Sequence, residues 1–172
     1  MSESLATGVV VRRARPEDLD PVGEVTVAAY AEFTEGPDDH YIALLRDAAR
    51  RDREAQLWLA ELDGEVVGTV TLTPEGSPWR EIGEPGEGEF RMLAVAPSAR
   101  RRGVGEALMQ LVFERFRELG AHAIVMSSLA EMTAAHRVYA RLGFVRLPER
   151  DWSPVPGVDL IAFRAALCWR PP

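Results

Sequence analysis

The 172-residue sequence predicts a single α/β domain over residues 1–172, in which helices flank a mixed, largely antiparallel sheet. Two features predict this class. An Asp63-Gly64 turn between two segments rich in β-forming residues is the pattern of a β-hairpin. A strand–helix–strand unit over residues 89–127 requires its two strands to be parallel if they pair. We expect the core of the domain to span about residues 9–167.

The first third of the chain is predicted to form one short strand and two helices. Val9–Val11 is a short apolar run, and Pro16 begins a helical segment because proline and the acids after it suit a first helical turn. Apolar residues then recur at helical spacing as far as Phe33. After a proline-containing turn, a second helix is expected to reach Arg53, and its charged end, residues 46–53, is expected to face solvent.

The middle of the chain is predicted to supply the central strands and a long amphipathic helix. Residues 74–88 are assigned to a loop because they are rich in proline, glycine and acids. A helix after Gly103 carries one apolar stripe and is expected to end at Gly120. The antiparallel strands of this region are expected at Gln56–Leu62, Glu65–Thr73 and Glu89–Val95.

The last third is predicted to add a parallel strand, a helix and two final strands. Ala123–Ser127 is a short buried strand by its composition. Ser128 and Glu131 have the spacing of a capping box, so a helix is expected to begin there and to close at Gly143. The remaining strands are expected at Phe144–Val145 and Val158–Ala165, separated by the proline-rich loop Pro148–Gly157.

Composition excludes several functional classes. The formal net charge of -7 disfavours nucleic acid as a partner, because phosphate neutralisation dominates such binding. All 20 basic Lys and Arg residues are arginine, so no P-loop or Schiff-base lysine exists. The single cysteine, Cys168, cannot form an intramolecular disulfide, which fits a reducing cytoplasm. No signal peptide or membrane-length apolar run is evident, so we expect a cytoplasmic protein without a membrane partner.

The segment Glu89–Leu108 contains the main functional pattern. An apolar strand ends at Pro97, three consecutive arginines follow, and Gly103 and Gly105 lead into the long helix. The free amides and the partial positive charge of a helix start favour an anion such as phosphate, and arginines add charge-assisted hydrogen bonds. The segment lacks the third glycine of a dinucleotide fingerprint and the lysine of a P-loop. An anion-binding turn is therefore predicted, with a solvated basic corner as the alternative.

Two motifs resemble those of the GNAT (Gcn5-related N-acetyltransferase) superfamily. The acyl-CoA-binding motif of that family is similar to Arg100-x-x-Gly103-x-Gly105. The family signature for the helix and strand that close the acyl-CoA site is similar to Ala135-x-x-x-Tyr139-x-x-x-Gly143-Phe144. The expected order of strands and helices also matches the family over essentially the whole chain. The resemblance implies the acyl-CoA N-acyltransferase fold, in which the parallel strands 89–95 and 123–127 are splayed around acetyl-CoA.

The resemblance also implies where acetyl-CoA would bind. The pyrophosphate would rest on the amides of Arg101–Gly105, and the pantetheine arm would run beside Leu93–Val95 like an added strand. Met132 stands where family members often have an asparagine that contacts the cofactor, and Ser128 or a water molecule is expected to replace that contact. No metal is expected. The implied cofactor-binding residues are Leu93, Ala94, Val95, Arg100, Arg101, Arg102, Gly103, Val104, Gly105, Glu106, Ser128, Met132 and Ala135.

The family reaction is acyl transfer from a thioester to an amine, and the resemblance implies two catalytic residues. A base is needed because presenting an alkylamine in its neutral form at pH 7 costs about 4–5 kcal/mol. Glu89 occupies the strand position that supplies this base in some family members, with Glu87 as the second choice and a solvated carboxylate as the alternative. Tyr139 matches the tyrosine that protonates the departing thiolate, with an ordinary core aromatic as the alternative. His136 is expected to have no catalytic role.

The acceptor is expected to be an amine-bearing small molecule or the N-terminus of a peptide or protein. In this fold the first two helices and the loop between the last two strands line the acceptor groove. Acids and aromatic residues in these segments suit a cationic amine. The resemblance also allows a homodimer, with Trp152 and Trp169 as candidate interface residues. The candidate acceptor-binding residues are Tyr30, Phe33, Glu35 and Trp152.

Two functions of different class remain open from the sequence. In the first, the chain is an acetyl-CoA-dependent N-acetyltransferase that uses Glu89 and Tyr139. In the second, it is a non-catalytic acyl-CoA-binding or sensing module that kept the cofactor site and lost turnover. Tyr139 and Glu89 together favour the enzyme, whereas the departure at Met132 favours the sensing module.

Overall fold

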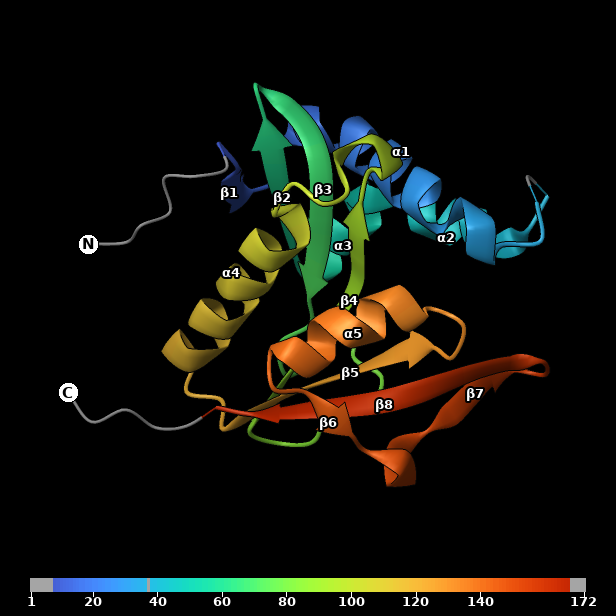
Figure 1. Ribbon diagram of the computed structural model, residues 1–172, viewed down its shortest axis with the longest axis vertical. Helices are drawn as coiled ribbons and strands as arrows, with labels where there is room; N and C mark the ends of the chain where they lie inside the picture. Colours follow the sequence, from blue (N-terminus) through green and yellow to red (C-terminus); the bar gives the residue numbers. More distant parts are fainter. Residues whose placement is uncertain (1–7, 37, 168–172) are drawn as a thin grey trace. The chain divides into compact units, whose positions relative to one another are not determined.

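The computed structural model describes residues 8–36 and 38–167 (Figure 1). Hydrogen bonding orders the strands β1-β2-β3-β4-β5-β8-β6, and β7 pairs with β8. The strands are β1 (Val10–Arg13), β2 (Gln56–Leu62), β3 (Glu65–Leu72), β4 (Glu87–Val95), β5 (Ala123–Leu129), β6 (Val145–Arg146), β7 (Trp152–Val155) and β8 (Val158–Ala166). The α-helices are α1 (Leu19–Tyr30), α2 (His40–Arg46), α3 (Ala48–Glu54), α4 (Val104–Glu118) and α5 (Thr133–Arg141).

The sheet is mixed and mostly antiparallel, which confirms the fold class predicted from the sequence. Parallel pairing joins β4 to β5 at three register positions, from Glu87 opposite Ala123 to Glu89 opposite Val125. The chain forms two compact units, and both β4 and α4 contribute to each of them. The first unit contains the described residues up to Leu72 together with Met92–Val112, and the second contains Thr73–Arg91 with the described residues from Phe113 onward. Among the described helices, none has the length and apolar character that a membrane span requires.

In the first unit, helices pack on both faces of the β2–β3 hairpin. Leu57 and Leu59 of β2 are fully buried with residues of α1 and α3. On the other face, a Cβ atom added to Gly68 would lie 2.7 Å from a methyl group of Val104, so this glycine lets the start of α4 approach β3 closely. The hairpin turn itself is as predicted, because Asp63 and Gly64 both have positive φ, at 51° and 81°.

The second helix predicted from the sequence is in fact two helices. The chain breaks at Asp47, whose side chain caps α3 by accepting a hydrogen bond from the amide of Arg50. The prediction that residues 46–53 face solvent is wrong at Arg51, which is 0% exposed. Its guanidinium donates to the carbonyls of Leu44 and Leu45, both at 2.9 Å. Two backbone carbonyls thus hold this buried guanidinium in place, and a charge pattern alone does not reveal such burial.

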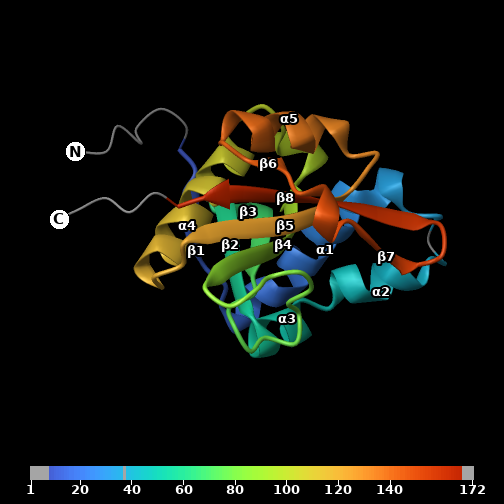
Figure 2. The ribbon, with the colours of Figure 1, turned by 90° about the horizontal axis from the view of Figure 1, so that it is seen from below.

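In the second unit, α5 lies along β5 and β8, and β4, β5 and β8 run side by side (Figure 2). Gly88 permits close packing here, since a Cβ atom at this position would overlap the ring of Phe116 in α4. The end of α4 follows the prediction. Gly120 has φ 77°, and the amide of Ala121 bonds the carbonyl of Phe116 at 3.0 Å.

Two predictions for the end of the chain are wrong. The capping box does not form, because β5 continues through Ser128 to Leu129 and α5 begins only after an N-cap at Met132 that lacks a side-chain hydrogen bond. The proline-rich segment before the last strand is not all loop, since β7 lies within it and forms a hairpin with β8. The register shifts between Trp152 and Val155, where proline cannot donate to the ladder.

Candidate functional site

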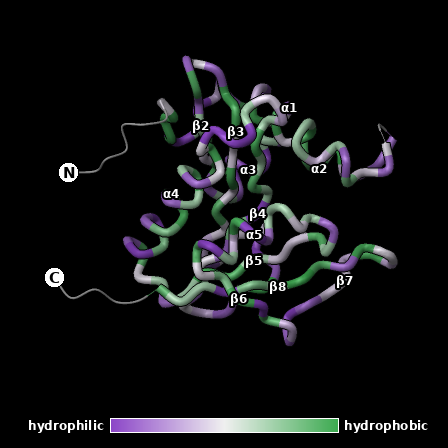
Figure 3. Tube along the Cα trace, viewed as in Figure 1, coloured by the Kyte–Doolittle hydropathy of each residue, from purple (hydrophilic) through white to green (hydrophobic). Residues whose placement is uncertain are grey.

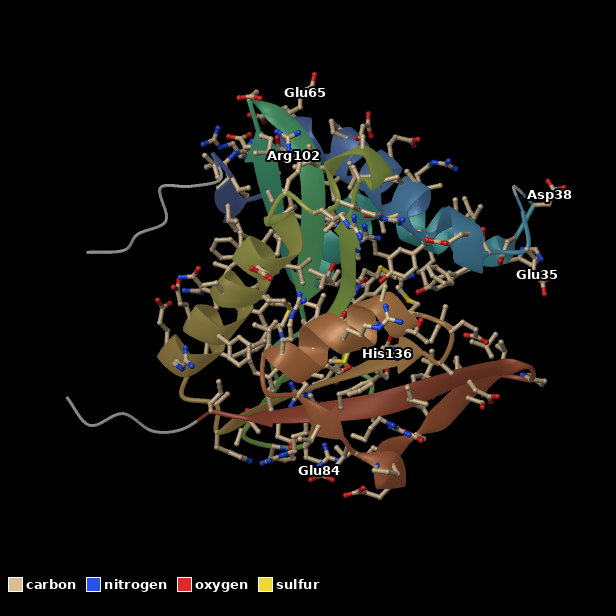
Figure 4. All side chains as sticks on the ribbon, viewed as in Figure 1. Glu35, Asp38, Glu65, Glu84, Arg102 and His136 are labelled. Carbon is tan, nitrogen blue, oxygen red and sulfur yellow. The ribbon has the colours of Figure 1, made fainter. Side chains whose placement is uncertain are left out.

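The turn from β4 to α4 lies in the first unit. A short 3₁₀ helix, Pro97–Ala99, is followed by three exposed arginines, and Arg102 is labelled on this turn in Figure 4. Figure 3 shows the same stretch as strongly hydrophilic. Arg101 and Gly103 both have positive φ, at 64° and 79°. Left-handed residues in a turn before a helix orient successive amides inward, so the turn has the form of an anion nest.

The residues around this turn leave its three arginines exposed to solvent. Arg100 makes an exposed ion pair with Glu32 at 3.3 Å, and such a pair contributes about 0–1 kcal/mol. Glu106 is exposed in the first turn of α4, and Val104 is buried. Gly105 has room beside it, because an added Cβ atom would meet only a methyl group of Val95 at 3.8 Å. The turn can therefore accept an anion without displacing buried packing.

The second half of β4 carries the residues predicted to bind the pantetheine arm. Ala94 is buried, whereas Leu93 and Val95 are partly exposed. Met92, directly before them, has φ 52°, which is uncommon for a non-glycine residue inside a strand and distorts the strand locally. The hydroxyl of Tyr30 donates to the carbonyl of Leu93 at 3.2 Å. Tyr30, a candidate for acceptor binding, thus contacts Leu93, a candidate for cofactor binding, within the first unit.

The other acceptor-groove candidates of the first unit follow α1. Phe33 is partly exposed in the 3₁₀ helix Ala31–Phe33. Glu35 is exposed, and its amide donates to the carboxylate of Asp39 at 3.0 Å. The Glu35 side chain points to solvent (Figure 4). An exposed acidic side chain at this position suits a cationic ligand.

Tyr139 lies in the second unit, on α5, and is 4% exposed. Its ring contacts three phenylalanines at centroid distances of 5.7–6.1 Å, in edge-to-face or tilted geometry: Phe90, Phe144 and Phe163. Burial in this apolar cluster raises the pKa of the Tyr139 phenol well above its usual value. The phenol is therefore protonated at pH 7, which is the form required of a proton donor.

The residues around the start of α5 include three predicted cofactor contacts. Ser128 is buried, and its hydroxyl lies 3.0 Å from Nε2 of His136. His136 is labelled on α5 in Figure 4. Burial lowers the pKa of His136, a backbone bond with Leu129 partly opposes this, and the neutral imidazole packs on Phe163. Met132 and Ala135 are partly exposed.

Glu89 is fully buried in β4, with 0% exposure. Its carboxylate accepts hydrogen bonds from the backbone amides of Glu81, Ile82 and Gly83, at 2.7–3.1 Å. Burial raises the pKa of Glu89, and these three amides partly offset the rise. Glu89 therefore fixes the segment before β4, an arrangement that its position in the sequence does not indicate.

The segment predicted as a loop between β3 and β4 is extensively bonded. The guanidinium of Arg80 donates to the carbonyls of Thr73, Gly83, Glu84 and Glu87, at 2.7–3.3 Å. Glu87, the second-choice base, is 5% exposed and pairs with Arg150 at 2.6 Å and with Arg164 at 3.4 Å. Glu81 pairs with Arg91 at 2.9 Å. Sequence reasoning missed the roles of Arg80, Glu81, Arg91 and Arg150, because nothing local in an acidic, glycine-rich segment signals which charges pair across it.

Trp152 begins β7 in the second unit and is partly exposed. Its indole nitrogen lies 3.4 Å from the hydroxyl of Ser127. The predictions made for Cys168 and Trp169 lie outside the described residues. Within residues 8–36 and 38–167, no group of three or more His, Cys, Asp or Glu side chains is placed to hold a metal ion.

A mixed, mostly antiparallel sheet with one parallel strand pair is the arrangement expected of the acyl-CoA N-acyltransferase fold. A family model described as "Acetyltransferase (GNAT) family" matches residues 23–144. The chain therefore belongs to the GNAT acetyltransferase family.

Individual relatives agree with this membership. A mycothiol acetyltransferase from Cellulomonas flavigena is 30% identical over 91% of this chain and 48% of its own length. The chain thus spans about half the length of the mycothiol acetyltransferases that it matches. A GNAT-family acetyltransferase from Staphylococcus aureus has the same fold, with a TM-score of 0.74, 16% identity and coverage of 93% of this chain and 99% of that one. The Salmonella typhimurium protein yncA, solved with its cofactor acetyl-CoA, has a TM-score of 0.65, 19% identity and coverage of 95% and 96%.

Proposed function

We propose that the chain is an N-acetyltransferase that moves an acetyl group from acetyl-CoA to the primary amine of an acceptor. The observation that carries the proposal is the exposed arginine turn at the start of α4, with left-handed Arg101 and Gly103, in a chain of the GNAT family. A diphosphate needs several N–H donors in a concave turn, and this turn offers backbone amides, a helix start and three guanidinium groups.

The remaining cofactor contacts are proposed for each unit by itself. In the first unit, the backbone of Leu93–Val95 would pair with the amides of the pantetheine arm. In the second unit, the proposed cofactor contacts are Ser128, Met132 and Ala135. The fit is favourable for Ser128, whose hydroxyl is already oriented by His136 at 3.0 Å. Acetyl-CoA supplies the activated acyl group, and no metal is proposed to take part.

The proposed chemistry is one direct displacement. The amine nitrogen attacks the thioester carbonyl carbon, a C–N bond forms and the C–S bond breaks. Tyr139 is proposed to donate its phenolic proton to the departing sulfur, as its match to the family tyrosine implies. A carboxylate takes the proton that the acceptor ammonium must lose. Glu89 is the predicted base. It is fully buried, and its carboxylate already accepts hydrogen bonds from three backbone amides.

The acceptor is proposed to be a small primary amine or a peptide N-terminus. Its candidate contacts are Tyr30, Phe33 and Glu35 of the first unit and, considered separately, Trp152 of the second. The similarity to a protein named mycothiol acetyltransferase favours a small-molecule amine. An acidic residue such as Glu35 also suits an ammonium group, because opposite charge raises its local concentration. Homodimer formation and a cytoplasmic location stay predictions from the sequence.

The test is release of free CoA thiol from acetyl-CoA in the presence of single amines: L-cysteine, L-aspartate, glucosamine, and a peptide with an N-terminal alanine. Release that depends on one amine, with an acetylated product seen by mass spectrometry, supports the proposal. Tight binding of CoA by calorimetry with no release on a broader amine panel would instead support the non-catalytic acyl-CoA module. That outcome would agree with Met132 lacking the side-chain contact common in the family.

A further inference from the structure

In the first unit, an ion pair joins two segments that the proposed function assigns to different substrates. Nη2 of Arg100, in the turn before α4, lies 3.3 Å from Oε1 of Glu32. Arg100 belongs to the proposed diphosphate turn, whereas Glu32 lies in the 3₁₀ helix Ala31–Phe33, beside the acceptor candidates Tyr30 and Phe33. The two paired residues are 68 positions apart in the sequence, so the fold brings the end of α1 to the turn.

A second contact holds the end of α1 in this place. The hydroxyl of Tyr30 donates to the carbonyl of Leu93 at 3.2 Å, and Leu93 lies in the strand that leads to the turn. Both contacts fall within the first unit. Because Tyr30 binds this strand, Glu32 does not depend on its own ion pair to stay near Arg100.

The pair between Arg100 and Glu32 can be exchanged for another partner. The two side chains are 49% and 58% exposed, and a pair this exposed contributes little to stability because water and salt compete with it. A diphosphate carries more charge than one carboxylate. It would also meet the inward amides of the turn formed by left-handed Arg101 and Gly103. Arg100 would therefore bond the diphosphate in preference to Glu32.

This exchange changes the charge of the segment proposed to bind the acceptor. Once Arg100 bonds the cofactor, the carboxylate of Glu32 no longer has that cation opposite it. Its charge then acts together with that of Glu35, which follows three positions later and is also exposed. An ammonium group gathers where negative charge is uncompensated. Binding of the cofactor thus prepares this segment for a cationic acceptor.

We propose that the pair of Arg100 and Glu32 couples the two substrates. The diphosphate of acetyl-CoA takes Arg100 from Glu32, and Glu32 then attracts the ammonium group of the acceptor. This inference rests on the proposed N-acetyltransferase function. No covalent bond changes in the exchange, and Glu32 affects binding of the acceptor rather than the chemical step. The coupling is reciprocal, so each substrate binds more tightly when the other is present.

The test compares Glu32→Gln with the wild type at low ionic strength, where surface charges are least screened. Calorimetric titration measures CoA affinity, and steady-state kinetics at saturating acetyl-CoA measure kcat and KM for the panel amine of highest turnover. We expect CoA affinity to rise about two- to fivefold, because the diphosphate no longer competes with Glu32 for Arg100. We expect KM for the amine to rise by a similar factor while kcat is unchanged. A residue with a merely structural role would not shift the two substrates in opposite directions.

Glu24→Gln is the matched control. It removes the same charge from α1 and breaks an exposed ion pair of the same kind, since Glu24 lies 2.9 Å from Arg46 of α2. CoA affinity and KM for the amine are expected to stay at their wild-type values. Both glutamates are exposed, so the melting temperatures of the two variants should match that of the wild type.

A double-mutant cycle separates exchange of the pair from simple repulsion between Glu32 and the diphosphate. In an Arg100→Gln background, Glu32→Gln is expected to leave CoA affinity unchanged, because the shared partner is gone. An equal gain in both backgrounds would overturn the inference, since repulsion alone would then explain it.

Two further outcomes distinguish the inference from the function on which it rests. Unchanged CoA affinity in Glu32→Gln, or an amine KM that does not rise, would overturn the coupling and leave the acetyltransferase function intact. A wild-type protein that binds CoA but releases no thiol with any amine would overturn the proposed function, and the coupling with it.

Discussion

The rings of Phe90 and Tyr139 meet edge to face, with centroids 6.1 Å apart. Phe90 follows Glu89 directly in β4, and neighbouring side chains of a strand point to opposite faces. Tyr139 therefore lies on one face of β4, while Glu89 and the segment it holds lie on the other.

Replacing Tyr139 with phenylalanine should remove the proton donor and keep the packing. The ring would retain its contacts with Phe144 and Phe163, so unfolding by urea should change little. Loss of a general acid lowers rates about 100- to 10,000-fold, and we expect kcat to fall in this range with CoA affinity unchanged by calorimetry. Tyr41→Phe, at an exposed position on α2, is the control. Equal losses of kcat and CoA affinity would show that Tyr139 acts by packing alone.

The turn before α4 can be tested with two glycines that differ in backbone conformation. Gly103 has φ 79°, where an alanine is disfavoured by about 1–2 kcal/mol, so Gly103→Ala should lower stability and weaken CoA binding. Gly105→Ala should fold normally, because its Cβ atom would meet only Val95 at 3.8 Å. Urea unfolding and calorimetric titration with CoA measure the two effects. Unchanged CoA affinity in Gly103→Ala would count against an anion-binding turn.

The elements that the sequence predicted well are those specified by local rules. The Asp63-Gly64 hairpin needs two left-handed residues, and these two residue types supply them. The end of α4 at Gly120 follows from the same conformational preference. The strand β7 was missed because Pro154 breaks its pattern, and only its partner β8 makes it a strand.

The parts of the candidate site that the sequence did not predict depend on contacts between distant residues. Nothing in the local pattern distinguishes the buried Arg51 from the exposed arginines around it, because burial is set by packing of the surrounding helices. Likewise, Glu87 pairs with Arg150, 63 positions away, and no spacing rule predicts such a pair. The motifs located the turn and the tyrosine, whereas the hydrogen bonds from the amides of residues 81–83 to Glu89 became visible only in the three-dimensional structure.

The pairing of Glu87 predicts a stability that falls in acid. Burial opposes ionisation, but hydrogen bonds from Arg150 and Arg164 hold the pKa of Glu87 below its usual value. The charged form is thus favoured in the folded state, and its contribution is present above about pH 4.5 and is lost as pH falls through the lower folded pKa. Breaking a buried pair costs roughly 3 kcal/mol, so Glu87→Gln should be less stable than the wild type at pH 7. Urea unfolding at pH 7 and pH 3 should show the two curves converging in acid; a constant difference would exclude the linkage.

The raised pKa of Glu81 predicts the opposite dependence. In the folded protein this carboxyl titrates near 7, against about 4.5 in the unfolded chain. Between these values the folded state holds a proton that the unfolded chain has released, so the Glu81 contribution destabilises the fold progressively as pH rises from about 4.5 to 7. Glutamine resembles the protonated acid and does not titrate. Glu81→Gln should therefore match the wild type in urea unfolding at pH 4 and exceed it in stability at pH 8, where the wild-type carboxylate is charged. A variant less stable than the wild type at pH 8 would instead mean that the ion pair of Glu81 with Arg91 stabilises the fold.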